Sequence, residues 1–458
     1  MNIFKKILRI LLIVIVIALV PGIWYAWQAF PIISGYGAKN MASAIYLQHR
    51  MPEDVIREDL GDFPQSLVRF TYNEKDSSVT GSVFGMAKRK AIYRKGTGCT
   101  LINDITEEQI RRQIFTIPAA PAANRDSIAW PYGDKLNDSF PGNIDRERLE
   151  QAVKDAFDQP YEGKPVYTRA VLVLYNGQLI SETYAPGFDK YTVMLGWSMS
   201  KSLTGAMIGI LVKEGKLNVN APAPVPEWKR TSKESITLQN LLQQTTGLDF
   251  EEKYTGPSEV TNMLFKRGDM AAFTAKLPLK HEPGTHFNYS SGNSNILSRI
   301  IRHTVGEKLY AGFPYTALFY KINAYSFLLE PDASGTFIGS SYSYATARDF
   351  ARFGLLYYNQ GKWNGEQLLP ENWVKESITP PGANPYRNYG YQFWLNGQRE
   401  TDITKKAYPD VPSDMFYADG YGGQDIYVIP SEKLVVVRLG LHKIDENKLL
   451  KGVIAAIR

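Results

Sequence analysis

Cysteine and histidine are scarce in this chain. Cys99 is the only cysteine among 458 residues, so no disulfide can form within the chain, and there are five histidines. His281 and His286 lack the spacing of an H-E-x-x-H zinc motif, and the Pro-Gly step between them breaks the helix that such ligands need. The G-x-S-x-G elbow of an α/β-hydrolase is also missing. The sequence therefore predicts no metal site and no cofactor, and it argues against a zinc hydrolase and against an α/β-hydrolase.

A long basic run is absent as well. The net charge of +6 is the small difference between 52 basic and 46 acidic residues, so we expect no nucleic-acid partner. Apolar residues make up 44% of the chain, which suffices for the substantial core of one large or two moderate domains.

Charged side chains are missing from residues 10–38, directly after three basic residues, Lys5, Lys6 and Arg9. Residues 10–27 are mostly aliphatic. As a helix they would be about 27 Å long, close to the thickness of a hydrocarbon core. Trp24 and Trp27 would then lie at the far membrane interface.

We therefore expect residues 1–32 to form an N-terminal transmembrane anchor. The basic residues favour a cytoplasmic N-terminus, which places the rest of the chain on the extracytoplasmic side, periplasmic or extracellular, of the cytoplasmic membrane. The alternative is a cleaved signal peptide. An uncleaved signal-anchor fits better, because bulky residues fill positions 23–28 and no small-x-small cleavage site follows.

The rest of the chain divides near residue 145. Residues 33–144 read as an irregular stem or lead-in module of unknown role, with a Pro/Ala-rich stretch at 117–123. Residues 145–458 read as one compact domain that begins and ends with strands around a helical middle. This order predicts an α/β (α+β) fold, in which both ends of the domain build one antiparallel sheet and the middle forms an all-helical inserted region.

Local patterns place the elements of that domain. Strands are expected at residues 169–175 and 178–184, joined by an Asn-Gly turn, and at residues 424–429 and 433–439. Helices are expected at residues 146–157, 198–214, 238–244, 259–265, 295–304 and 447–457.

The motif S-x-x-K occurs once, at Ser198 and Lys201. Side chains three residues apart share a helix face, so the lysine amine, if neutral, can accept the proton of the serine hydroxyl. One or two such matches (roughly 1.5) are expected by chance, and the alternative is an ordinary first turn of a helix. The motif gains meaning only with partners elsewhere in the chain.

Two further blocks supply such partners. Tyr289 lies in the loop ahead of a predicted helix, where a phenol can relay a proton beside an amine. The glycine-rich stretch 417–424 runs into a late strand, where a backbone N–H can stabilise an oxyanion. Taken singly, each has an ordinary explanation, core packing for a tyrosine and a plain hairpin for the glycines.

Together and in this order, these motifs resemble the serine β-lactamase and penicillin-binding-protein superfamily over residues 145–458. The resemblance includes the blocks 236–248, 289–291, 346–354 and 420–423. The chain looks class C-like and is most similar to the 6-aminohexanoate-dimer hydrolase and family VIII esterase branch. The resemblance implies an antiparallel sheet flanked by helices, and catalysis through an acyl-enzyme.

The resemblance also implies roles for individual residues. Ser198 would be the nucleophile, Lys201 the base and Tyr289 the proton relay, with the backbone N–H groups of Ser198 and Tyr421 as the oxyanion hole. It further implies four substrate-binding residues, Tyr254, Ser291, Gly420 and Gly422.

Two departures from the family pattern bear on the substrate. Ala418-Asp419-Gly420 replaces the usual Lys-Thr-Gly or His-Thr-Gly, so the cation that faces a substrate carboxylate is missing. Ser291 replaces the usual asparagine of the tyrosine motif. We therefore expect a membrane-anchored serine hydrolase, carboxylesterase or amidase-like, acting on a small-molecule ester, small amide or peptide.

Two alternatives stay open. One is a D,D-peptidase or β-lactamase-type penicillin-binding enzyme. The other is a non-catalytic protein of the same fold that binds peptide or peptidoglycan.

Overall fold

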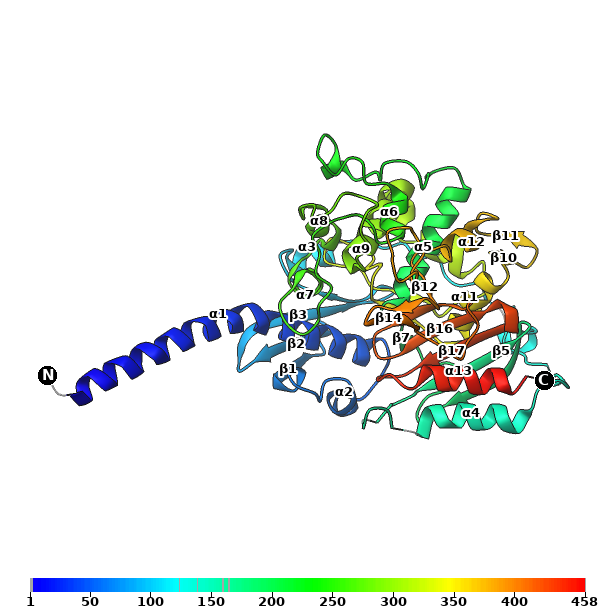
Figure 1. Cartoon of the computed structure of the whole chain (residues 1–458), viewed down its shortest axis with the longest axis horizontal. Helices are drawn as coiled ribbons and strands as arrows, with labels where there is room; N and C mark the ends of the chain where they lie inside the picture. Colours follow the sequence, from blue (N-terminus) through cyan, green and yellow to red (C-terminus); the bar gives the residue numbers. More distant parts are fainter. Residues whose placement is uncertain (1–2, 123, 138, 159, 164, 458) are drawn as a thin grey trace. The chain divides into compact units, whose positions relative to one another are not determined.

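The computed structural model describes residues 3–122, 124–137, 139–158, 160–163 and 165–457, without the side chains of residues 3, 8 and 13–18 (Figure 1). The chain divides into two compact units. The first comprises residues up to Arg94, Cys99–Arg111 and Glu251–Gly268, and the second comprises Lys95–Gly98, Arg112–Phe250 and the chain from Asp269 onward.

The first unit is a long helix packed on a four-stranded antiparallel sheet. Helix α1 (Ile3–Tyr46) lies against a sheet with the strand order β1-β2-β3-β4, and a short helix α2 (Pro52–Glu58) links the two. The strands are β1 (Val68–Asn73), β2 (Ser78–Val83), β3 (Met86–Arg94) and β4 (Gly98–Leu101). The backbones approach closely, because a Cβ on Gly81 would lie 2.7 Å from the Ser34 carbonyl oxygen.

The expectation that residues 33–144 are irregular is therefore wrong for much of this segment. Strand β3 contains Lys88, Arg89 and Lys90 and so lacks an apolar pattern, whereas β1 alternates apolar and polar residues, which is a strand signal that the prediction missed. The sheet is stable because its other face packs against α1, which the strand sequences alone do not reveal.

The predicted transmembrane stretch 10–27 lies within α1, and the side chains of residues 13–18 in it fall outside the described part. Over the residues that the structure describes, no helix has an apolar stretch long enough to cross a membrane.

Part of the expected helical middle also belongs to the first unit. Helix α7 (Glu259–Lys266) packs on α1, with the ring centroids of Phe265 and Tyr36 5.6 Å apart. The Lys266 amine donates to the Gln28 side chain at 2.9 Å. Residues 251–268 thus pack with α1 in the first unit, although the chain on both sides of them belongs to the second unit.

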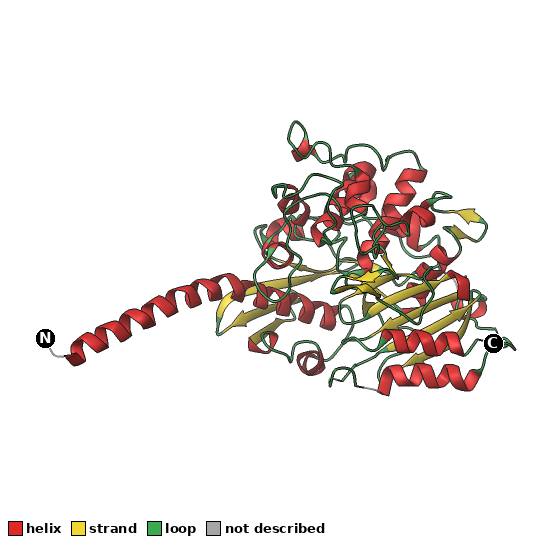
Figure 2. Cartoon of the chain, in the orientation of Figure 1, coloured by secondary structure: helices red, strands yellow, loops and turns green. Residues whose placement is uncertain are grey.

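The second unit is built on a six-stranded antiparallel sheet with the order β12-β15-β16-β17-β5-β6. Strands β5 (Ala170–Tyr175) and β6 (Gln178–Tyr184) come early in the chain, and β15 (Phe416–Gly420), β16 (Gln424–Ile429) and β17 (Leu434–Leu439) come late. The prediction that both ends of the domain build one sheet is confirmed. Figure 2 shows helices on both sides of these strands.

Each face of the sheet has its own core. Helices α4 (Arg146–Asp158) and α13 (Glu446–Ala455) pack on the face that bears Val171, Tyr427 and Val436. Helices α5 (Met199–Lys213) and α11 (Ala347–Tyr358) pack on the face that bears Leu172, Ile426 and Val437.

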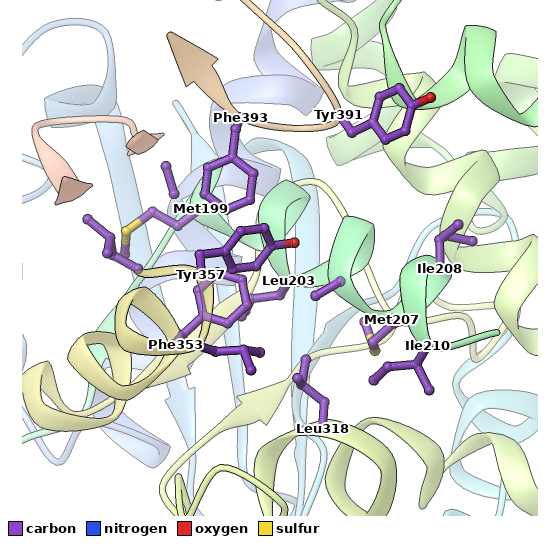
Figure 3. Close-up of a cluster of buried hydrophobic side chains, with 14 of the residues drawn as sticks. Met199, Leu203, Met207, Ile208, Ile210, Leu318, Phe353, Tyr357, Tyr391 and Phe393 are labelled. Carbon is purple, nitrogen blue, oxygen red and sulfur yellow. The ribbon is translucent and has the colours of Figure 1, made fainter. Parts of the chain in front are cut away.

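Helix α5 is buried along almost its whole length. Its side chains Met199, Leu203 and Met207 belong to one buried hydrophobic cluster that also contains Phe353, Tyr357 and Phe393 (Figure 3). A helix that is apolar on all sides belongs in the interior, so the start of α5 has a fixed position.

Residues 112–144 lie in the second unit, and a buried ionic cluster attaches them to α11. Arg352, which is 0% exposed, donates to Asp349 and to Asp134, each at 2.7 Å. Burial alone would raise the pKa of Asp134, but hydrogen bonding and charge from Arg352, with Arg125 and Arg348 nearby, hold that pKa below its ordinary value.

Strand β12 (Trp394–Leu395) is the edge strand of the six-stranded sheet, and helix α3 (Glu107–Arg111) belongs to the first unit. The other elements of the second unit are the helices α6 (Leu238–Leu242), α8 (Met270–Ala275), α9 (Ser291–Val305), α10 (Glu307–Tyr310) and α12 (Trp373–Ser377) and the short strands β7 (Met194–Leu195), β8 (Leu328–Leu329), β9 (Ser343–Ala345), β10 (Lys362–Trp363), β11 (Glu366–Gln367), β13 (Gln398–Arg399) and β14 (Asp402–Lys406).

Candidate active site

Ser198 occupies the N-cap position of the buried helix α5, and its side chain makes no capping hydrogen bond. The preceding Trp197 has a φ of 45°, in the left-handed region that a bulky side chain rarely adopts. Ser200 stabilises this turn, because its hydroxyl donates to the Trp197 carbonyl at 2.7 Å and accepts from the Ser343 N–H at 3.0 Å. The backbone therefore presents the Ser198 hydroxyl at a rigid, strained corner.

The Lys201 amine lies beside that hydroxyl. Its Nζ is 2.9 Å from Ser198 Oγ, 3.0 Å from Ser291 Oγ and 3.1 Å from the Ser340 carbonyl oxygen, and the residue is 1% exposed. These three neighbours are hydroxyls and a carbonyl, and none of them is a carboxylate. A neutral amine could donate to Ser291 and Ser340 and keep its lone pair for the Ser198 proton.

Ser291 was expected to bind substrate, and the structure places it on the lysine. It is 0% exposed at the start of α9, and the preceding Ser290 caps that helix by accepting from the Asn293 N–H at 3.2 Å. The Ser291 hydroxyl therefore helps to orient the Lys201 amine.

The ring of Tyr289 lies next to the Lys201 amine. The Lys201 Nζ is 4.8 Å from the centroid of the Tyr289 ring. Tyr389 and Trp394 pack around that ring, with centroids 5.6 and 5.0 Å from it. Aromatic packing on two sides limits the rotation of Tyr289 and keeps its phenol in the neighbourhood of the Ser198–Lys201 pair.

The glycine-rich turn between β15 and β16 approaches the backbone just before Ser198. A Cβ on Gly420 would lie 2.3 Å from the Gly196 carbonyl oxygen, so only glycine fits there. The next residue, Tyr421, is 68% exposed, and its ring contacts Trp197 edge-on with centroids 5.8 Å apart. The N–H groups of Ser198 and Tyr421 thus belong to two segments that touch.

Arg438 holds this turn from inside the sheet. Its guanidinium donates to the carbonyls of Gly422 and Gly423 at 2.9 and 2.8 Å, and the residue is 0% exposed. Gly422 has a φ of 79°, and a Cβ on Gly423 would lie 2.4 Å from Arg438 Nη1. The guanidinium therefore fills the space that a side chain at position 423 would need.

Gln424 makes a second set of contacts to the turn. Its amide donates to the Tyr421 carbonyl at 3.3 Å and to the Gly440 carbonyl, and its oxygen accepts from the Gly440 N–H at 3.2 Å. Gln424 and Arg438 together hold the carbonyls of three consecutive residues of the turn, Tyr421, Gly422 and Gly423.

Ala418 and Asp419 point to opposite faces of the sheet. Ala418 is buried in the core that includes α5, whereas the neighbouring Tyr417 belongs to the core beneath α4 and α13. Asp419 alternates with Ala418 and so shares the face of Tyr417, opposite Asp425 on β16. The acid that follows Ala418 in sequence is thus directed away from α5.

Asp425 is fully buried and lies between Asp419 and Arg438 across the strands. Burial raises the pKa of the Asp425 carboxyl well above its usual range, and the facing Asp419 raises it further. Burial also raises the pKa of the Asp419 carboxyl, although the positive charge of Lys443 acts against this.

Tyr254 lies in the first unit. It is 52% exposed, and its hydroxyl donates to Glu252 at 2.7 Å. The structure thus assembles Ser198, Lys201, Tyr289, Ser291, Gly420, Tyr421 and Gly422 within the second unit and leaves Tyr254 in the other. Within the described ranges, no group of three or more histidine, cysteine, aspartate or glutamate side chains could hold a metal ion.

Sequence reasoning missed the Ser340 carbonyl and Arg438. A backbone carbonyl leaves no trace in the sequence. Arg438 does leave one, because it is a single charge in the strand LVVVRL, where a buried cation needs specific acceptors.

The model of the beta-lactamase family matches residues 153–440. The 6-aminohexanoate-dimer hydrolase of Paenarthrobacter ureafaciens is 26% identical over 362 residues, which cover 72% of this chain and 81% of that protein.

Two solved structures share the fold. A family VIII carboxylesterase matches with a TM-score of 0.54 at 14% identity and covers 70% of this chain and 100% of its own. A penicillin-binding protein homologue from Caulobacter crescentus matches with a TM-score of 0.51 at 15% identity, covering 68% and 98%. The resemblance inferred from the motifs is confirmed: the chain belongs to the beta-lactamase family and is a serine hydrolase.

Proposed function

We propose that the protein cleaves an ester or a small amide through an acyl-enzyme on Ser198, and that its N-terminal helix anchors it to a membrane. The observation that carries the catalytic part is the 2.9 Å contact between Ser198 Oγ and Lys201 Nζ, with the amine otherwise held by a hydroxyl and a carbonyl.

In the acylation step, Ser198 Oγ bonds to the substrate carbonyl carbon while its proton passes to Lys201 Nζ. The carbonyl π electrons move to oxygen, where the N–H groups of Ser198 and Tyr421 stabilise the negative charge. When the tetrahedral intermediate collapses, the bond to the leaving group breaks, and Tyr289 relays the proton from Lys201 to the departing alcohol or amine. Water then hydrolyses the acyl-enzyme by the same steps in reverse order.

Two features favour esters and small amides over β-lactams and D-alanyl peptides. Ala418 offers no cation for a substrate carboxylate, and Asp419 lies on the other face of the sheet. Tyr289, Trp394, Trp197 and Tyr421 place aromatic surface around Ser198, which suits an uncharged substrate.

A membrane anchor is supported by the start of the chain. Basic residues precede an apolar stretch, and the α1 side chains Leu19, Val20 and Ile23 are all more than half exposed (53, 61 and 65%). Exposed apolar side chains at this density mark a surface that contacts lipid or another protein, and the basic residues that precede them favour lipid.

The first prediction concerns the nucleophile. We expect a fluorophosphonate probe to label the protein, and Ser198→Ala to abolish the labelling and the hydrolysis of p-nitrophenyl esters, because Ser291, the second hydroxyl on the Lys201 amine, is fully buried. The matched control is Ser232→Ala at the exposed Ser232, which should leave both unchanged. Labelling of well-folded Ser198→Ala at the wild-type level would rule out the acyl-enzyme.

The second prediction concerns the substrate. We expect kcat/KM for a p-nitrophenyl ester to exceed that for nitrocefin by about tenfold to hundredfold, since a missing charge-assisted hydrogen bond costs about 1.5–3 kcal/mol. D-Alanyl peptides should also be poor substrates. Ser198→Ala provides the background rate for each compound. Faster turnover of nitrocefin than of the ester would instead support the β-lactamase alternative, and binding of a D-alanyl peptide without turnover of any compound would support the non-catalytic one.

The third prediction concerns the turn that carries Tyr421. Losing a whole oxyanion donor costs about 10²–10³ in kcat. We expect Arg438→Met and Gln424→Met, which only loosen the turn, to lower kcat by about tenfold while KM changes little. Arg399→Met at an exposed arginine is the control. Folding is checked by thermal unfolding, and a rise in KM with unchanged kcat in both variants would contradict a positioning role.

The fourth prediction concerns the anchor. The full chain should sediment with membranes of the expressing cells and be released by detergent but not by high salt. In spheroplasts, added protease should digest the hydrolase, as expected for an extracytoplasmic domain. Recovery of the full chain in the soluble fraction would contradict the anchor.

A further inference from the structure

One end of the sheet in the first unit is aromatic, and the other end is charged. At the first end, the turn between β2 and β3 exposes Phe84 (66%) and Met86 (55%). Phe63, which is 80% exposed, lies in the segment that enters β1, and β1 begins opposite Val83. At the opposite end, the turn between β1 and β2 consists of Glu74, Lys75, Asp76 and Ser77.

The turn at Phe84 does not need a phenylalanine. Val83 pairs with Met86, so Phe84 and Gly85 form a two-residue hairpin turn in which both have positive φ, 51° and 74°. Asparagine followed by glycine is the favoured pair for this turn, and a bulky side chain at its first position is strained. An exposed aromatic ring at a strained position points to a role outside the folding of the hairpin.

Helix α1 leaves the sheet at this aromatic end. Phe30 contacts Phe84 with ring centroids 5.8 Å apart, while Tyr46 stacks on Tyr93 at 5.6 Å. The Tyr93 N–H donates to the Ser77 carbonyl at 2.8 Å, which places the C-terminal end of α1 by the charged turn. The N-terminal part of α1 therefore extends beyond the strands of this sheet (Figure 1).

The exposed fraction of the α1 side chains falls sharply just before Phe30, the residue that contacts Phe84. Trp24 and Trp27 are 64 and 78% exposed, whereas Ala29 and Ile32 are buried at 7 and 8%. The exposed indoles thus come directly before the part of α1 that packs on the sheet, close to the level of Phe30 and Phe84.

We propose that this aromatic end of the first unit lies on a lipid bilayer, with Phe63, Phe84 and Met86 in the interfacial region beside Trp24 and Trp27 of α1. The inference rests on the membrane anchoring proposed above and extends it, because it gives the β-sheet module a function: the hairpin tip is a second membrane contact.

A bilayer fits this surface better than a protein partner does. Aromatic side chains prefer the interface between headgroups and hydrocarbon, and the surface is continuous with the helix proposed to enter the membrane. Arg69 and Lys88 are exposed close behind the apolar tip, where phospholipid phosphates would lie. Two contacts, one helix and one hairpin, would restrict how the module tilts on the membrane.

Depth-dependent fluorescence quenching tests this surface. In a Cys99→Ala background, the full chain carries an environment-sensitive fluorophore at one of three positions, Ile23→Cys, Phe84→Cys or Glu74→Cys, and is reconstituted into phospholipid vesicles that contain a lipid spin-labelled near the headgroup. Position 23 reports the anchor, position 84 the hairpin tip, and position 74 is the matched control at the other end of the same sheet.

We expect quenching at positions 23 and 84, at least about twofold stronger than at position 74, because only the first two reach the interface. If the fluorophore is quenched at position 23 but is quenched no more at position 84 than at position 74, the second contact is overturned and the anchor is left intact. Quenching at none of the positions overturns both. A blue shift at 84 without quenching shows a protein contact, for example a second copy of the chain, and also overturns the proposal.

A variant that favours the turn distinguishes an effect on the folding of the hairpin from an effect on its contact with the membrane. Phe84→Asn supplies the residue that this turn prefers, so thermal stability should stay the same or rise. With the fluorophore at Phe63→Cys, quenching should fall by about half when Phe84→Asn is added, since the tip loses its aromatic ring. Unchanged quenching at position 63 would overturn the role assigned to Phe84.

Discussion

The site depends on one buried amine. Lys201 is 1% exposed, and its Nζ contacts hydroxyls and a carbonyl at 2.9–3.1 Å. Removing an ammonium from water costs several kcal/mol unless other groups replace its hydration. Helix α5 puts Lys201 one turn after Ser198, α9 supplies Ser291, and the segment before β9 supplies Ser340. Three elements distant in sequence must therefore pack correctly before the amine has its partners.

The sheet supports the same site from the other side. Arg438 is also fully buried, and it is held by carbonyls of the turn that carries Tyr421 and by Thr168 and Val166. The two buried cations thus have different tasks. Lys201 lies where a proton can move, whereas Arg438, whose guanidinium keeps its charge, holds the backbone in place.

Much of the hydrolase-like unit could be predicted from sequence, because its signals are local. The Asn-Gly turn identified β5 and β6, and the apolar spacing after Ser198 identified α5. The four-stranded sheet of the first unit was missed, because strands such as β3 are rich in lysine and arginine and are stabilised by α1. The contact between Ser291 and Lys201 spans 90 residues and leaves no local pattern.

The path of segment 251–268 affects how the protein can be divided. Val260, Met263, Leu264 and Phe265 of α7 are buried within the first unit, although the chain on both sides of the segment belongs to the hydrolase-like unit. A fragment that starts at residue 145 would keep α7 but lose α1, and Phe265 would lose its contact with Tyr36. A cut at residue 145 therefore separates α7 from the helix on which it packs, although it leaves the hydrolase-like sequence unbroken.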